Sequence, residues 1–253
     1  MYTDEQLEEL EQEERVITEE AIVAMIFILH GLKSDLEREV RSFYQKYGKD
    51  GVVTYQEARK WVSEKDHRKR INVLYGIIGL GFANVLDDMS KEFENFLKGV
   101  ITKESEFFDV ALEIEKFLKT KWGIDDLTWL ERLENDVAVW NKHVANDLKT
   151  SMLQRKHIDE VIEQLDDRFT TMEKVLYTLA ITESTGIGSL AREVICRELG
   201  AKKYRFYAKA DERTCDYCGA LHGKVFPMTA YEVGVTASPI HPRCRCWEVP
   251  VID

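Results

Sequence analysis

Proline is scarce in this sequence and is confined to one end of it. The four prolines are Pro227, Pro239, Pro242 and Pro250. Proline lacks a backbone N–H and clashes with the preceding turn, so it interrupts helix interiors. Its absence from residues 1–226 therefore permits long, uninterrupted helices over most of the chain.

Basic residues are also fewer than acidic ones. The chain has 35 Lys and Arg against 46 Asp and Glu, a net charge of −11. From Ala201 onward there are 8 basic and 6 acidic residues, which leaves 27 basic and 40 acidic residues before it. An acidic surface repels phosphate instead of releasing its counterions. We therefore expect a body that does not hold DNA, and at most a modest DNA contact through the C-terminal basic residues Lys202, Lys203, Lys209, Arg243 and Arg245.

Long apolar runs are missing as well. The uncharged run Ile71 to Leu86 is shorter than the ~20 apolar residues of a membrane-spanning helix, so we expect no membrane span. It contains Gly79 and Gly81, but Asn84 occupies the third glycine position of a dinucleotide-binding loop. We expect a buried helix pair with close glycine packing, or a hinge, with membrane contact as the alternative. The N-terminal stretch is acidic where a secretory signal needs a basic region, which favours synthesis in the cytoplasm and reduced cysteines.

Apolar residues recur at helical spacing along most of the chain. Such spacing lets helices bury one face against their neighbours in a bundle. His30 falls in the first stripe, and we expect it to be a buried, hydrogen-bonded histidine. The stripes are Ile22, Met25, Ile26, Leu29, Leu36, Val40, Phe43 and Tyr47; Leu130, Leu133, Val137, Trp140 and Val144; and Ile158, Ile162, Leu165 and Phe169.

The expected fold is mainly α, with about five to seven helices before Gly200. We expect residues 1–170 to form an acidic, elongated helical bundle. After Gly200 the segment 202–210 alternates aromatic and basic residues, which is typical of a strand. Turn residues and prolines follow it, so we expect residues 171–253 to form a compact, small α+β domain.

Four of the five cysteines lie between Cys215 and Cys246. Cys215 and Cys218 have the spacing that directs two thiolates at one centre, and His241 and Cys244 can supply the opposing pair across a proline turn. Thiolate and imidazole ligands favour zinc. We therefore predict a structural Zn²⁺ site with Cys215, Cys218, His241 and Cys244 as ligands, which supplies much of the folding energy of a small domain.

The fourth ligand has two alternates, Cys246 and His222. Cys246 is expected outside the ligand set, on the premise that residues 244–246 run as a strand and that its side chain points away from that of Cys244. In an irregular turn this premise fails. Arg213, Arg243 and Arg245 lie beside the ligands and are expected to offset the thiolate charge.

Other chemistry has little support in the sequence. A redox role for Cys215 and Cys218 lacks the surrounding thioredoxin-like βαβ pattern. Cys196 is isolated on an expected helix and is interpreted as a buried apolar residue. No Ser/His/Asp order, P-loop or paired-carboxylate site stands out, so we expect no catalytic residue and no enzyme activity.

At these cysteines the sequence resembles a known family. From about Thr178 to Pro250 it is similar to the C-terminal domain of the phage Mu F-like minor head proteins, also called phage head morphogenesis proteins. That family has an Arg-Thr-Glu helix, a strand, Asp-x-Arg-Thr-Cys-x-x-Cys, a Gly and aromatic pair, and His-Pro-x-Cys-Arg-Cys. The matching segments here are Thr182–Glu183, Tyr204–Tyr207, Asp211–Cys218, Gly223 with Phe226, and His241–Cys246.

The sequence departs from that pattern at two positions: Ile181 replaces the arginine, and Pro239–Ile240 replaces Pro-Pro. The resemblance implies a helical, metal-binding minor capsid protein of the virion, made in the host bacterial cytoplasm. It further implies association with the portal and capsid proteins during head assembly and DNA packaging or exit. Two alternatives remain open: an enzyme similar to ADP-ribosyltransferases, since such domains also occur joined to toxin modules, and a zinc-dependent DNA-binding protein.

Overall fold

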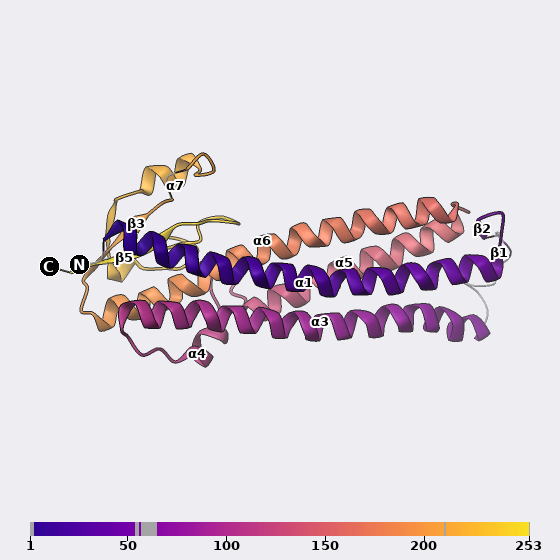
Figure 1. Ribbon diagram of the computed structural model, residues 1–253, viewed down its shortest axis with the longest axis horizontal. Helices are drawn as coiled ribbons and strands as arrows, with labels where there is room; N and C mark the ends of the chain where they lie inside the picture. Colours follow the sequence, from indigo (N-terminus) through magenta and orange to yellow (C-terminus); the bar gives the residue numbers. More distant parts are fainter. Residues whose placement is uncertain (1–2, 54–55, 57–64, 210, 253) are drawn as a thin grey trace. The chain divides into compact units, whose positions relative to one another are not determined.

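The computed structural model describes residues 3–53, 56, 65–209 and 211–252, with backbone alone for residues 4 and 65–80 (Figure 1). The described chain is mainly helical, as expected. Five of its helices precede Gly200, within the expected range. The helices are α1 (Asp4–Tyr47), α3 (Lys65–Phe108), α4 (Ile114–Leu118), α5 (Trp129–Leu153), α6 (Ile158–Glu198) and α7 (Asp216–Leu221), with a 3-10 turn, η1, at Met228–Ala230.

The strands form two small antiparallel sheets. A hairpin pairs β1 (Gly48–Lys49) with β2 (Val52–Val53). Near the C-terminus, β3 (Lys203–Tyr207) lies between β4 (Val225–Pro227) and β5 (Trp247–Val251). The strand expected from the alternating aromatic residues is therefore confirmed.

Side chains alternate along β3 as the pleat of a strand requires. Tyr204 and Phe206 are fully buried, whereas Lys203 and Arg205 are exposed. Tyr204 packs with Cys196 of α6, and Phe206 packs with the cysteines that follow α7. β3 thus contacts both α6 and the segment that carries Cys244 and Cys246. Cys196 is fully buried, as expected, and its burial raises the pKa of its thiol to about 12.

The chain divides into two compact units, residues 24–90 with 133–176, and residues 1–23, 91–132 and 177–253. In the first unit the expected stripes form the core. Met25 and Leu29 are fully buried, and the ring of Trp140 lies 4.7 Å from Phe82 and 4.9 Å from Phe169.

The second unit combines the start of α1 with the C-terminal residues. Leu7 and Leu10 of α1 pack with Phe108 of α3 and Ile195 of α6. The predicted domain division between residues 170 and 171 falls inside α6, which is continuous there. That division remains a prediction.

A buried ion cluster also holds the second unit together. The side chain of Arg192 on α6 is 6 % exposed and contacts the carboxylates of Glu14 on α1, at 3.1 Å, and Glu104 on α3. Removing one partner of such a buried pair typically costs about 3–5 kcal/mol, because the remaining charge is left uncompensated. The cluster therefore fixes three helices that are distant in sequence.

Residues 71–86 lie within the single helix α3, so no break between two helices falls there, and the side chains of residues 71–80 lie outside the described part. The expected close glycine packing is found at Gly81, where an added Cβ would lie 2.8 Å from Cδ1 of Leu32 on α1. The expectation for His30 is wrong. The His30 side chain is 54 % exposed, with Nε2 2.7 Å from the Glu173 carboxylate. One residue corresponds to about 100° around a helix, so the neighbour of buried Leu29 turns away from the core. No helix in the described ranges has the length and apolar character of a membrane span.

Candidate metal centre

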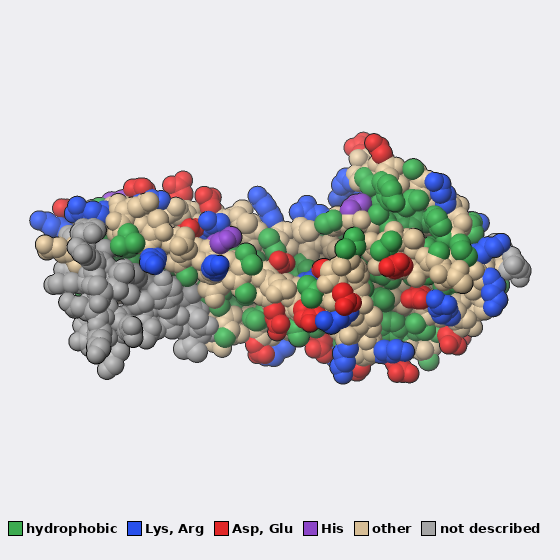
Figure 2. Space-filling model, turned by 180° about the vertical axis from the view of Figure 1, so that it is seen from behind, with side chains coloured by type: hydrophobic (Ala, Val, Ile, Leu, Met, Phe, Trp, Pro, Cys, Tyr) green, Lys and Arg blue, Asp and Glu red, His purple; other side chains and the backbone are tan. Residues whose placement is uncertain are grey.

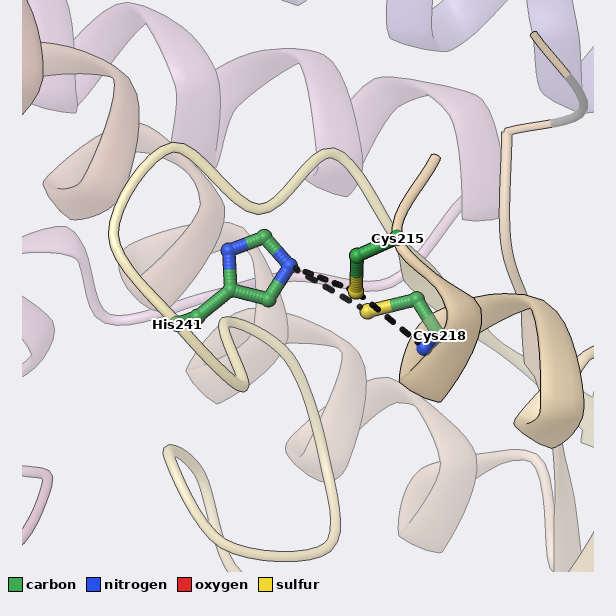
Figure 3. A group of neighbouring side chains, drawn as sticks. All are labelled: Cys215, Cys218 and His241. Carbon is green, nitrogen blue, oxygen red and sulfur yellow. Dashed lines mark hydrogen bonds between the residues drawn. The ribbon is translucent and has the colours of Figure 1, made fainter. Parts of the chain in front are cut away.

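The short helix α7 positions the first two cysteines. Cys215 is its N-cap residue, and the Cys215 sulfur accepts a hydrogen bond from the backbone N–H of Cys218 at 3.4 Å. The first turn of the helix brings the Cys218 side chain to the same side. Both sulfurs face Nε2 of His241, at 3.3 Å from Cys215 and 3.4 Å from Cys218 (Figure 3).

The ring of His241 is oriented by its own loop. Its Nδ1 lies 2.9 Å from the carbonyl oxygen of Pro242. A carbonyl oxygen can only accept, so Nδ1 donates and a neutral ring presents the lone pair of Nε2 to the two sulfurs. Metal-binding histidines are fixed in the same manner, by a hydrogen bond from the nitrogen that does not bind the metal.

Cys244 and Cys246 lie in an irregular segment just before β5. Their sulfurs and that of Cys218 lie within 4.8 Å of one another, and all three residues are buried. The premise that a strand would turn Cys246 away from Cys244 is wrong, because residues two apart along a strand point to the same face. The regular strand begins only at Trp247. The structure therefore places Cys246 beside the predicted ligands.

The predicted ligands fall into two overlapping groups. Cys215, Cys218 and His241 form one, and Cys218 also belongs to the group with Cys244. In a tetrahedral zinc site with Zn–S of about 2.3 Å and Zn–N of about 2.0 Å, two sulfurs are about 3.8 Å apart and sulfur and nitrogen about 3.5 Å apart. The Cys218 and Cys244 sulfurs are 3.9 Å apart, close to the first value, and the two S···N distances are close to the second. These three spacings are those of a tetrahedral site, whereas Cys244 lies outside the group formed by Cys215, Cys218 and His241. The donor types and these spacings therefore suit a metal ion, with Cys218 as the residue common to both groups.

The protonation of the thiols is uneven across the centre. The Cys218 N–H lowers the pKa of the Cys215 thiol. A hydrogen bond from Cys246 lowers the pKa of Cys244 to about 5, and the same contact raises the pKa of Cys246. Burial raises the pKa of Cys218 to about 12. Thiolates bind metal ions, so metal binding here is expected to release the remaining protons.

His222, the other alternate ligand, belongs to neither group. Its Nδ1 lies 3.2 Å from the backbone nitrogen and 3.1 Å from the carbonyl oxygen of Ala208. This ring nitrogen is thus engaged with the backbone, while its ring packs on Tyr207 at 4.7 Å.

Two of the neighbouring basic residues are engaged with acidic ones. Arg245 shares its charge with Asp211 through contacts of 2.5 and 2.6 Å, and Lys209 is ion-paired with Glu11. Two of the five residues expected to contact DNA are therefore neutralised locally. In the view of Figure 2, acidic and basic side chains are interspersed over the surface and do not form one basic face.

Helix α6 holds the segment that carries His241 and Cys244. The Thr182 hydroxyl accepts a hydrogen bond from the backbone N–H of Arg243 at 3.0 Å. The Thr185 hydroxyl donates to the carbonyl of Cys244 at 2.8 Å. No sequence pattern marks Thr185, whereas Thr182 belongs to the Thr-Glu pair of the family pattern.

Glu183, beside Thr182, binds a different part of the chain, the segment that carries Trp122 and Arg132. Its side chain is 1 % exposed and accepts hydrogen bonds from Arg132 at 2.8 Å and from the indole N–H of Trp122 at 3.1 Å. Burial raises the pKa of Glu183 to about 7, against the opposing effect of Arg132. Thr182 and Glu183 therefore link α6 to the cysteine segment and to the turn before α5.

These features define a class: a mainly helical protein with a compact cysteine–histidine module, from β3 to β5, that packs against the long helix α6. Residues 142–249 match the model of the family described as Phage Mu protein F like protein, which confirms the resemblance expected for the C-terminal region.

The chain is also similar to a Haemophilus influenzae protein described as "Uncharacterized protein", with 24 % identity over 185 residues. That match covers 66 % of this chain and 41 % of the relative, so the chain spans about two fifths of that protein's length. No solved structure matches the chain.

Proposed function

We propose that this protein is a minor head protein of a tailed phage or prophage, located in the virion and without enzyme activity of its own. The observation that carries the proposal is the family match over residues 142–249. The finer part of the proposal is association with the portal and the capsid interior during head assembly and DNA packaging or exit.

The C-terminal module, in this proposal, is closed by one structural zinc ion. Cys215, Cys218 and His241 supply three ligands, and Cys244 supplies the fourth. The sulfur and nitrogen spacings of about 3.3–3.9 Å support this set. Four protein ligands leave no coordination position for water or substrate, so the ion would stabilise the module instead of taking part in a reaction.

Quantitative mass spectrometry of purified heads and proheads tests the head assignment. Particles induced from the host are expected to contain this chain in a small number of copies relative to the major capsid protein. Particles assembled without the portal are expected to lack it. Absence from both heads and proheads would contradict the assignment.

A further inference from the structure

A cavity of about 320 Å³ lies beside the metal centre, within the unit that holds the C-terminal residues. It is bounded by the start of α1, the middle of α6 and the segment from His241 to Trp247. Its size is at the lower end of the ~300–1,000 Å³ range of ligand pockets. Five arginines contribute to its wall: Arg15, Arg192, Arg213, Arg243 and Arg245.

Two of these arginines have charge available for a ligand. Arg192 and Arg245 are paired with carboxylates, and Arg15 lies 2.8 Å from Glu19. Within the described ranges Arg243 has no ion pair: its Nε donates to the Thr178 hydroxyl.

Arg213 approaches Asp211 only at 4.0 Å, and like Arg243 it is exposed. Guanidinium groups have five N–H donors in a fork that matches a carboxylate. Arg213 and Arg243 therefore offer a binding position for an anionic group.

The rest of the wall is apolar, uncharged or acidic. Ile181, Trp247 and Tyr177 line it, together with the carboxylates of Glu11 and Glu14. Among the described residues, one oxygen of Glu14 and the indole N–H of Trp247 are buried without a hydrogen-bond partner. The wall thus holds one unsatisfied acceptor and one unsatisfied donor, and a peptide amide carries the complementary pair.

We propose that this cavity binds a carboxylate-bearing peptide segment of a partner protein. Arg213 and Arg243 hold the carboxylate, and an adjacent apolar side chain packs against Ile181 and Trp247. Glu14 is paired with Arg192 and Glu11 with Lys209, so neither adds a free negative charge that would oppose a bound carboxylate. A concave site of this size admits a chain end or one side chain, but not a nucleic-acid duplex. The proposal does not depend on zinc or on a place in the phage head.

Fluorescence anisotropy with the full-length chain and labelled pentapeptides tests the proposal. One peptide pool has a free C-terminus and no acidic side chain. A second pool is amidated and carries one Glu, and a third is amidated and carries Gln instead. Saturable binding of the first pool identifies a terminal carboxylate as the bound group, and saturable binding of the second identifies a side-chain carboxylate. One of these two results is expected, with no binding of the third pool.

Matched variants then test the position of the site. Arg243→Gln is expected to weaken binding about tenfold or more, because a charge-assisted hydrogen bond is lost. Ile181→Phe narrows the cavity without a change of charge and is expected to weaken binding as well. Arg205→Gln, an exposed arginine on β3 outside the cavity, is expected to bind as the wild type does. Melting temperature and zinc content are measured for each variant, so that only folded proteins are compared.

Three results would overturn the proposal. The first is no saturable binding of either carboxylate pool at about 1 mM peptide. The second is equal weakening by Arg243→Gln and Arg205→Gln. The third is displacement of the peptide by inorganic phosphate or AMP at a lower concentration than by unlabelled peptide, which would assign the cavity to phosphorylated ligands.

Discussion

Asp211 and Arg245 form a two-point ion pair, with Nη1 of Arg245 2.5 Å from Oδ2 and Nη2 2.6 Å from Oδ1 of Asp211. Asp211 precedes the Cys-x2-Cys pair, and Arg245 lies between Cys244 and Cys246. The ion pair therefore links the segment of Cys215 and Cys218 to the segment of Cys244 and Cys246, in addition to any link through a metal ion. It belongs to the module's structure more than to a surface that binds nucleic acid.

Asp211→Asn is expected to lower the melting temperature of the full-length chain at pH 7. Arg245 holds the pKa of Asp211 well below its usual range. A lowered pKa stabilises the folded state above the unfolded value of about 3.9, and the contribution is lost as the pH falls through the folded value. The difference in melting temperature between wild type and variant should therefore be full above about pH 4 and shrink below it.

The double variant Asp211→Asn with Arg245→Gln serves as the control for this pair. Its effect should be smaller than the sum of the two single effects, because both remove the same interaction. Additive effects, or an Asn variant that melts with the wild type at pH 7, would show that the pair contributes nothing.

Glu183→Ala is expected to destabilise the chain by about 3 kcal/mol or more. It leaves the buried N–H groups of Arg132 and Trp122 without their acceptor. Glu193→Ala, on the same helix, removes a surface pair with Arg197 and should cost about 0.5 kcal/mol. Denaturant unfolding followed by tryptophan fluorescence measures both, and equal costs would contradict the buried role of Glu183.

Glu183→Gln tests the raised pKa of the same residue. A carboxyl whose folded pKa is raised to about 7 contributes stability below its unfolded value, and that contribution is lost as the pH rises through about 7. The wild type should therefore lose stability relative to the Gln variant between about pH 4 and pH 7, from the unfolded to the folded pKa. Parallel stability profiles of the two proteins over this range would exclude the shift.

Cys244→Ser and Cys246→Ser distinguish the two thiols that the structure brings together. Cys244→Ser is expected to release the metal, because the Cys244 sulfur lies 3.9 Å from that of Cys218. Cys246→Ser is expected to keep the metal, since its hydroxyl can still donate a hydrogen bond to Cys244. Zinc lost from Cys246→Ser but kept in His241→Ala would show that Cys246 is the fourth ligand.

The sequence predicts local elements of this fold well. The missing prolines and the apolar spacing predict the long helices, and alternation along Tyr204 and Phe206 predicts β3. These signals are local, because each depends on residues a few positions apart. The burial predicted for His30 is wrong, since an apolar stripe does not fix the orientation of a residue at its edge.

Contacts between distant residues were not predictable. The packing of Leu7 against Ile195 and the ion pair of Glu14 with Arg192 join the start of α1 to the end of α6, and no spacing rule links them. The position of Cys246 beside Cys218 is another contact between residues that are distant in sequence, so local spacing does not predict it. The cysteine spacing predicts the types of ligand atom. It does not predict that Cys218 belongs to two overlapping groups of donors.

The zinc content of the full-length chain, measured by inductively coupled plasma mass spectrometry after purification at pH 7, tests the metal centre most directly. About one zinc per chain is predicted. Removing it with EDTA should increase hydrogen exchange at the backbone amides of β3 and α7, and adding zinc back should restore their protection. A chain that contains no zinc, and whose β3 and α7 amides are equally protected with and without EDTA, would contradict the zinc centre.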